Sequence, residues 1–201
     1  STAGLHPDAE LPKYAGQSFQ NLAAETPVLN REAPGFGRKV VLYATCFVNY
    51  NSPEVGVALR SVLARNGVES VVVHPSCCGM PLLEQGRIED VAKNARKVAA
   101  DMKDWIAKGY DIIAMVPSCA LMLKFEWPLI LPEDEDVRTL SKATFDVAEY
   151  IVDIARKEGM APGLEAIEGT MTVHMACHAR AQNMGQKAAD MLLSLIHISE
   201  P

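Results

Sequence analysis

Short apolar segments alternate with helical patterns along most of this chain, and this alternation limits the folds that are open to it. The segments 38–46, 68–74 and 110–116 are rich in β-branched residues and have the length of buried strands. Apolar residues at helical spacing follow at 51–67 and 87–107. Strands that alternate with helices of ten or more residues form parallel βαβ units. We therefore predict a three-layer α/β fold with a mainly parallel, Rossmann-like sheet and helices on both faces.

The carboxyl-terminal part continues the same pattern less regularly. We expect a helix at 142–157, a fourth strand at 169–175 and a final helix at 179–192. Pro128 is expected to break the helical turn before it, because proline lacks the backbone N–H that a helix interior needs. The acidic run 133–137 reads as a solvated loop or a helix cap rather than a metal site.

Composition and the positions of proline and glycine divide the chain into four segments. Residues 1–37 are rich in Pro, Gly and polar side chains and are expected to form a linker or an extended arm. Residues 38–168 hold one α/β domain, and 169–192 begin a second. The end, 193–201, resembles translated adapter sequence from DNA library preparation, and we expect an artefact there rather than a genuine amphipathic tail. Because the first residue is Ser1 and not Met, we expect a fragment of a longer protein.

Charge, hydropathy and cysteine usage exclude several function classes. The net charge is −6 and no run of Lys or Arg occurs, so a nucleic acid is not expected as a partner. No apolar run approaches the ~20 residues that span a bilayer. Five cysteines at uneven spacing do not resemble a secreted disulfide scaffold. We predict a cytoplasmic protein, with a peripheral position on the inner face of the cytoplasmic membrane as its variant.

Every cysteine follows a predicted strand. Cys46 closes the first strand, the pair Cys77 and Cys78 follows the second, Cys119 follows the third and Cys177 the fourth. The carboxyl ends of parallel strands share one edge of the sheet, and open α/β proteins build their sites there. The sequence therefore predicts that five sulfurs converge.

Convergent thiolates select zinc, copper(I) or iron–sulfur clusters. The chain has neither the CxxC of structural zinc and thioredoxin-like sites nor the cysteine spacing of bacterial ferredoxins. The adjacent Cys77 and Cys78 cannot easily bind one small ion together, but they can bind neighbouring irons of a larger cluster. An iron–sulfur assembly is favoured. Cysteines that act only as small buried hydrophobes, and a strained disulfide between Cys77 and Cys78, stay open as alternatives.

Residues beside the cysteines are candidates for supporting roles. Gly79 would let the backbone approach an inorganic core because it has no Cβ. Asn49 is expected to hydrogen-bond a sulfur or a substrate, or else to cap a helix. His178 is expected to support a second centre from outside its ligand set. His74 is expected to shape its loop, and Lys124 either balances cluster charge or is a solvated surface charge.

Four motifs carry a resemblance to a known family. They are "CFVNYN" (46–51), "CCGMPL" (77–82), "PSCALMLKFEWP" (117–128) and "VHMACHARAQNMG" (173–185). Over about residues 9–192 the chain resembles the CCG, or cysteine-rich, domain family of heterodisulfide reductase. Within that family it looks most like the iron–sulfur subunit of anaerobic glycerol-3-phosphate dehydrogenase, and related iron–sulfur subunits serve glycolate and lactate oxidation.

The resemblance implies two tandem CCG repeats, with 38–168 as the first and 169–192 as the start of the second. It implies that Cys46, Cys77, Cys78 and Cys119 bind the iron of a [4Fe–4S]-type cluster, and that Cys177 belongs to a second, incomplete site. Met122 stands where the family has the last cysteine of a CxxC. That departure argues against the five-cysteine noncubane form of the cluster.

The family further implies an iron–sulfur electron-transfer subunit of a flavoprotein dehydrogenase complex. Its partners would be the flavoprotein subunits, and its electrons would pass towards quinone, with a membrane anchor reached indirectly. Two alternatives stay open. One is a catalytic subunit of the heterodisulfide reductase type that reduces a disulfide at a cluster, and the other is a non-catalytic zinc-binding or assembly module.

Overall fold

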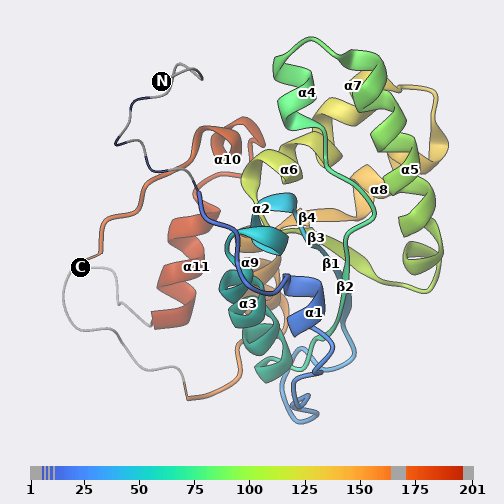
Figure 1. Cartoon of the computed structure of the whole chain (residues 1–201). Coiled ribbons are helices and arrows are strands. Elements are labelled where there is room, and N and C mark those ends of the chain that lie inside the picture. Colours follow the sequence, from blue (N-terminus) through green and yellow to red (C-terminus); the bar gives the residue numbers. More distant parts are fainter. Residues whose placement is uncertain (1–5, 7, 9, 11, 164–170, 197–201) are drawn as a thin grey trace.

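A four-stranded parallel sheet forms the centre of the protein in the computed structural model, which describes residues 6, 8, 10, 12–163 and 171–196 (Figure 1). The strands are β1 (Lys39–Tyr43), β2 (Glu69–Val73), β3 (Asp111–Ala114) and β4 (Thr144–Asp146), in the spatial order β2-β1-β3-β4. All three pairings are parallel. The predicted α/β fold with a parallel sheet is confirmed.

Helices connect the strands and cover the sheet. The helices up to β3 are α1 (Phe19–Leu22), α2 (Cys46–Tyr50), α3 (Pro53–Arg65), α4 (Met80–Glu84) and α5 (Ile88–Ala107). After β3 come α6 (Pro117–Leu121), the π-helical turn η1 (Met122–Glu126), α7 (Trp127–Ile130), α8 (Glu135–Ala143), α9 (Val147–Lys157), α10 (Cys177–Ala181) and α11 (Lys187–Ile196).

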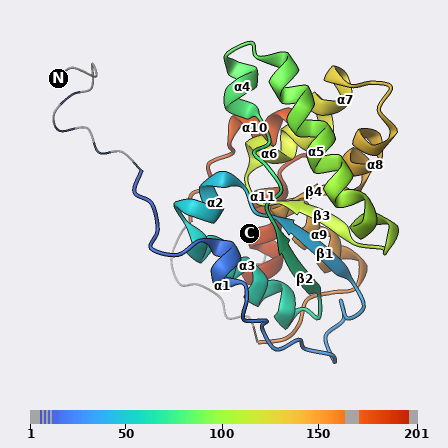
Figure 2. The same ribbon diagram turned by 45° about the vertical axis from the view of Figure 1, so that its right-hand side comes forward.

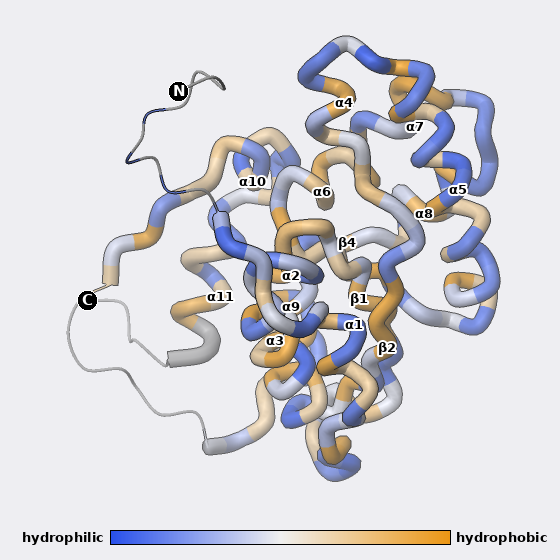
Figure 3. The backbone as a smooth tube through the Cα atoms, in the orientation of Figure 1, coloured by the Kyte–Doolittle hydropathy of each residue, from blue (hydrophilic) through white to orange (hydrophobic). Residues whose placement is uncertain are grey.

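The central strand β1 shows how the sequence produces three layers. Successive side chains of a strand point to opposite faces. Val41 and Tyr43 pack into the core that α5 and α8 cover, while Val40 and Leu42 pack against α3 and α9. All four residues are fully buried. The two helical layers lie on either side of the strands in Figure 2, and the strands are among the most apolar parts of the tube in Figure 3.

The fourth strand lies elsewhere than the sequence pattern predicted. The expected helix 142–157 is divided into the end of α8, the three-residue strand β4 and α9. Asp146 ends the strand and starts α9 with a capping box, in which its side chain accepts a hydrogen bond from a backbone N–H and Glu149 bonds back. This cap separates α8 from α9, although the apolar residues of the two helices follow one continuous helical spacing. The prediction of a strand at 169–175 is wrong where it is tested, because residues 171–175 are irregular and largely exposed. Residues 169 and 170 lie outside the described residues.

The structure also decides two smaller predictions. Of the two alternatives for the acidic run, the helix cap is found: Asp134 caps α8, its carboxylate accepting from the Val137 N–H at 3.1 Å, and the helix continues from Glu135. Pro128 does not break its helix, because the preceding turn η1 widens to π-helical geometry and proline falls at the start of α7.

An amino-terminal arm crosses α2 and α3, as residues 12–22 show in Figure 2. Phe19 is fully buried, and Gly56 of α3 leaves room for its ring, because a Cβ there would lie 2.6 Å from it. The side-chain amides of Gln20 and Asn49 hydrogen-bond, and the Gln20 N–H also donates to Asn49 at 3.1 Å. Arg60 donates to two backbone carbonyls of the arm at 2.9 Å each. The arm that the sequence predicted therefore packs on the domain.

The carboxyl-terminal segment packs beside α9 through α11, which runs to Ile196. The last residues of the expected artefact, 197–201, lie outside the described residues. No helix in the described ranges is both long enough and apolar enough to cross a bilayer.

Candidate metal centre

Three loops meet at the carboxyl edge of the sheet, and each carries cysteine. The chain leaves β1 towards β2 through α3 on one face and reaches β3 through α5 on the other, so the strand order reverses between β1 and β3. Ligands of open α/β sheets bind outside the carboxyl ends of the strands at such a point. Cys46 follows β1, Cys77 and Cys78 follow β2, and Cys119 follows β3.

The local structure around Cys46 differs slightly from the prediction. Cys46 does not close the strand but is the first residue of α2, and Thr45 caps that helix by accepting from the Val48 N–H at 3.3 Å. Cys119 similarly lies in α6, one turn beyond β3. Both sulfurs are thus positioned by a helix that starts at a strand end.

The loop that carries the vicinal cysteines is fastened by two buried aromatic residues. The Tyr43 hydroxyl donates to the Ser76 carbonyl at 2.6 Å, and Trp127 Nε1 donates to the Cys78 carbonyl at 3.1 Å. Both aromatic side chains are fully buried. Gly79 ends the loop with φ +82°, a left-handed conformation that disfavours other residues. A Cβ there would only touch Val91 at ordinary distance, so conformation rather than space requires this glycine.

The four sulfurs form a continuous chain of contacts. Cys119 Sγ lies 3.1 Å from Cys78 Sγ, and Cys77 is near enough to both Cys46 and Cys78 to change their pKa values. Cys78 and Cys119 are buried, whereas Cys46 and Cys77 are partly exposed, so the row of four sulfurs extends from the core to the surface. All four are free thiols in the structure.

Hydrogen bonding distributes charge unequally along this chain. Hydrogen bonds from Cys46 and Cys78, with a smaller contribution from the Gly79 N–H at 3.4 Å, lower the pKa of Cys77. The same contact with Cys77, together with burial, raises the pKa of Cys46. Hydrogen bonds to Cys119 and Cys77, and then burial, raise the pKa of Cys78. Burial raises the pKa of Tyr43, and the four thiols add to that effect, so its hydroxyl stays a donor. Of Cys46, Cys77 and Cys78, only Cys77 has its pKa lowered by these contacts.

The donor set fits a soft metal group, although its spacing is that of contacting thiols. Two thiolates on one tetrahedral zinc ion, each at 2.3 Å, lie about 3.8 Å apart, which is more than the 3.1 Å between Cys78 and Cys119. Among the described residues, no group of three or more His, Cys, Asp or Glu side chains is arranged to hold one ion. Sulfur is nevertheless the ligand that iron–sulfur clusters require, and a group with several metal atoms can bind sulfurs that do not surround a single point.

Three of the predicted site residues lie outside this set. Cys177 is exposed at the first residue of α10, and its sulfur contacts Nδ1 of the adjacent His178 at 3.7 Å. The convergence of five sulfurs is therefore seen for four. Asn49 is fully buried, and its amide bonds Gln20 of the arm instead of a sulfur.

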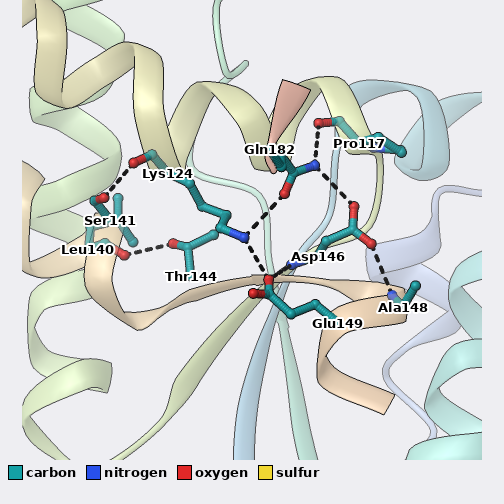
Figure 4. Close-up of polar contacts among 9 residues, drawn as sticks. All are labelled: Pro117, Lys124, Leu140, Ser141, Thr144, Asp146, Ala148, Glu149 and Gln182. Atoms are coloured by element: carbon teal, nitrogen blue, oxygen red, sulfur yellow. Dashed lines mark hydrogen bonds and ion pairs between the residues drawn. The ribbon is translucent and has the colours of Figure 1, made fainter. Parts of the chain in front are cut away.

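Lys124 also has a partner other than the cysteines, shown in Figure 4. Its Nζ lies 2.6 Å from Glu149 Oε2 and 3.3 Å from Gln182 Oε1. Gln182 in turn donates to the Pro117 carbonyl at 3.2 Å and to Asp146 Oδ2 at 3.3 Å. This polar network, Lys124–Glu149–Gln182–Asp146, joins the helix of Cys119 to the helix of Cys177.

The sequence did not predict the roles of three residues of the centre. No sequence pattern gave Tyr43 or Trp127 a role in the site, and only their hydrogen bonds to the Ser76 and Cys78 carbonyls show that they hold the loop. His74 was expected to shape the loop, yet its Nε2 lies 3.9 Å from Cys46 Sγ. The sequence signal for His74 was its place at the end of β2, the same signal that identified the cysteines.

Comparison with known proteins finds one family model and several relatives that are similar to this chain. Residues 40–124 match the family described as cysteine-rich domain, CCG. Lactate utilization protein A of Bacillus pumilus is 32% identical over 147 residues, which cover 70% of this chain and 58% of that protein. The protein of the same name from Geobacillus thermodenitrificans is 32% identical over 160 residues, covering 77% and 63%. No solved structure matches.

The chain spans about three fifths of the length of these relatives. They carry the name of lactate utilization protein A, so the narrower similarity to the iron–sulfur subunit of glycerol-3-phosphate dehydrogenase stays a prediction. The matched range begins in β1 and ends in η1, and it contains Cys46, Cys77, Cys78 and Cys119. A domain of this kind indicates a metal or iron–sulfur group, in agreement with the thiol donors at the sheet edge. Residues 40–124 of this chain, which hold four of its cysteines, are thus similar to the CCG cysteine-rich domain.

Proposed function

We propose that this protein is an iron–sulfur electron-transfer component of a flavoprotein dehydrogenase system. The observation that carries the proposal is the set of four thiols, Cys46, Cys77, Cys78 and Cys119, brought together by three adjacent parallel strands at the switch point of the sheet. The resident group would be a cluster of the [4Fe–4S] type, which supplies one-electron chemistry when bound. The protein holds the thiolates, encloses them and sets their hydrogen bonds.

The environment of Cys78 and Cys119 supports a role in holding a cluster rather than in a reaction of the free thiols. Cys78 and Cys119 are 3% and 8% exposed and lie in the core beneath α5. Thiols that react with substrates need access to solvent and a low pKa, and Cys78 has neither, because its contacts with Cys119 and Cys77, together with burial, raise its pKa. The partly exposed Cys46 and Cys77 give the centre one side near the surface, where an electron partner can approach.

The names of the relatives favour a small hydroxy acid as the source of electrons. We propose lactate oxidation by a flavoprotein partner as the supply, with glycerol 3-phosphate as the second candidate. Mixing the iron-loaded protein anaerobically with a lactate-oxidising flavoprotein, and separately with one that oxidises glycerol 3-phosphate, tests this choice. Bleaching of the cluster absorbance by only the second mixture would contradict it. Transfer onward to quinone at a membrane would follow from the same family pattern.

Anaerobic reconstitution with ferrous iron and sulfide tests the proposed function. We expect iron and acid-labile sulfide in equal amounts, together with a paramagnetic signal on reduction. Cys78→Ser should lose nearly all of both, because it removes the central sulfur of the contact chain. The matched control is Cys177→Ser, which changes an exposed cysteine that does not contact the other four sulfurs. This variant should retain the wild-type iron content. The proposal fails if wild-type protein takes up zinc alone, or if Cys78→Ser binds as much iron as the control.

A further inference from the structure

His74 brings a ring nitrogen to the outer end of the sulfur chain. It follows β2 directly, two residues before Ser76, whose carbonyl Tyr43 fixes. Its Nε2 lies 3.9 Å from Cys46 Sγ, within the range of hydrogen bonds to sulfur. No protein group among the described residues bonds its other nitrogen, Nδ1, which is enclosed.

Two aromatic rings fix the orientation of this imidazole. The Tyr50 ring meets it edge-on with centroids 5.7 Å apart, and the Tyr43 ring lies tilted at 6.3 Å. Tyr50 belongs to α2, the helix that begins with Cys46, so the same short helix positions the sulfur and one wall of the imidazole site. The contact between Nε2 and Sγ is thus built from two elements and does not depend on a free rotamer.

The position of the ring proton decides what this imidazole does at the contact. A neutral imidazole has one N–H and one bare nitrogen. When the proton is on Nε2, it faces the sulfur and the bare nitrogen is the enclosed Nδ1.

From this geometry we infer that His74 is a positioning and tuning residue, whose Nε2–H donates a hydrogen bond to the thiolate sulfur of Cys46. The inference rests on the proposed function, because the thiolate of interest is a cluster ligand. Hydrogen bonds to ligand sulfur spread its negative charge and favour the reduced cluster, so they raise the reduction potential. His74 would then raise the potential of a group held by Cys46, at the partly exposed end of the row of sulfurs.

A set of three variants separates this role from mere packing. His74→Phe keeps a ring between Tyr43 and Tyr50 but loses the N–H. His74→Gln keeps a side-chain N–H but loses the ring. The matched control is His174→Gln, which removes an exposed histidine that the site does not use. Each is reconstituted anaerobically as the full chain, and its midpoint potential is measured by a titration followed with electron paramagnetic resonance.

We expect His74→Phe to lower the one-electron reduction equilibrium constant roughly tenfold, equivalent to ~59 mV. His74→Gln should fall between it and the wild type, and His174→Gln should equal the wild type. A potential unchanged in His74→Phe at full iron content overturns the inference and leaves the proposed function intact. Loss of the cluster from both His74 variants also overturns it, because it would indicate a ligand or a structural residue.

The metal-free protein gives an independent measurement. Nitrogen-15 spectra distinguish a protonated ring nitrogen from a bare one, so they show which nitrogen of His74 carries the proton. We expect the proton on Nε2, with a change of that resonance in Cys46→Ala and none in Cys177→Ala. A proton on Nδ1, or no response to Cys46→Ala, overturns the inference. This arm remains decisive if the wild type takes up no cluster, in which case only the proposed function fails.

Discussion

Cys46 and Cys177 have similar local structure, but they lie in different parts of the fold. Each is the first residue of a five-residue helix, and each sulfur contacts a histidine nitrogen, at 3.9 Å for Cys46 and 3.7 Å for Cys177. Cys46 follows a buried strand in the middle of the sheet and meets other thiols, whereas Cys177 follows an irregular, largely exposed segment. Local signals place a cysteine at a helix start, and only neighbouring parallel strands bring several of them together.

The largest expected difference between the two regions is in their packing. Trp127→Ala removes a fully buried ring and its hydrogen bond to the Cys78 carbonyl, and should destabilise the protein by about 3–5 kcal/mol. Met184→Ala, in the segment after Cys177, removes a partly exposed side chain and should cost much less. Denaturant unfolding followed by circular dichroism measures both. Equal losses would contradict the view that the first region is the stable one.

Gln182 is the polar link between the two regions, and its removal tests their coupling. Gln182→Ala leaves the buried Asp146 and Lys124 each without one partner, and we expect a loss of about 1–3 kcal/mol. Hydrogen exchange should quicken in α10 and stay unchanged in β1 and β3. An equal loss of protection in β1 would contradict this expectation, because it would show that the two regions unfold together.

The smallest expected effect concerns the helix caps beside the two cysteines. Thr45 caps α2 through its hydroxyl, whereas Ala176 offers no side-chain cap to α10. Thr45→Ala should cost about 1 kcal/mol, and Ala176→Ser should stabilise α10 by a comparable or smaller amount. Thermal unfolding of the first variant and amide exchange in α10 of the second provide the measurements. An unchanged stability in Thr45→Ala would show that the sheet alone positions Cys46.

The sequence predicted the first three strands and the edge where four sulfurs meet, because β-branched runs and helical spacing are local patterns. It could not predict β4, since three residues are too few for a pattern and Asp146 interrupts a continuous helical periodicity. Residues 171–175 alternate like a strand, but alternation does not reveal whether a partner strand is available. The roles of Tyr43, Trp127 and Asn49 depend on contacts between residues far apart in the chain, which no local pattern records.

The arm that crosses α2 has a mechanical consequence. Its two hydrogen bonds to Asn49, together with those from the Ala15 N–H to the Tyr50 carbonyl and from Asn51 to the Lys13 carbonyl, hold the last turn of a helix whose first residue is Cys46. Because α2 has only five residues, the contacts of the arm and the Cys46 sulfur lie within about one helical turn of each other. The amino-terminal arm is therefore part of the structure that positions the first thiol of the site.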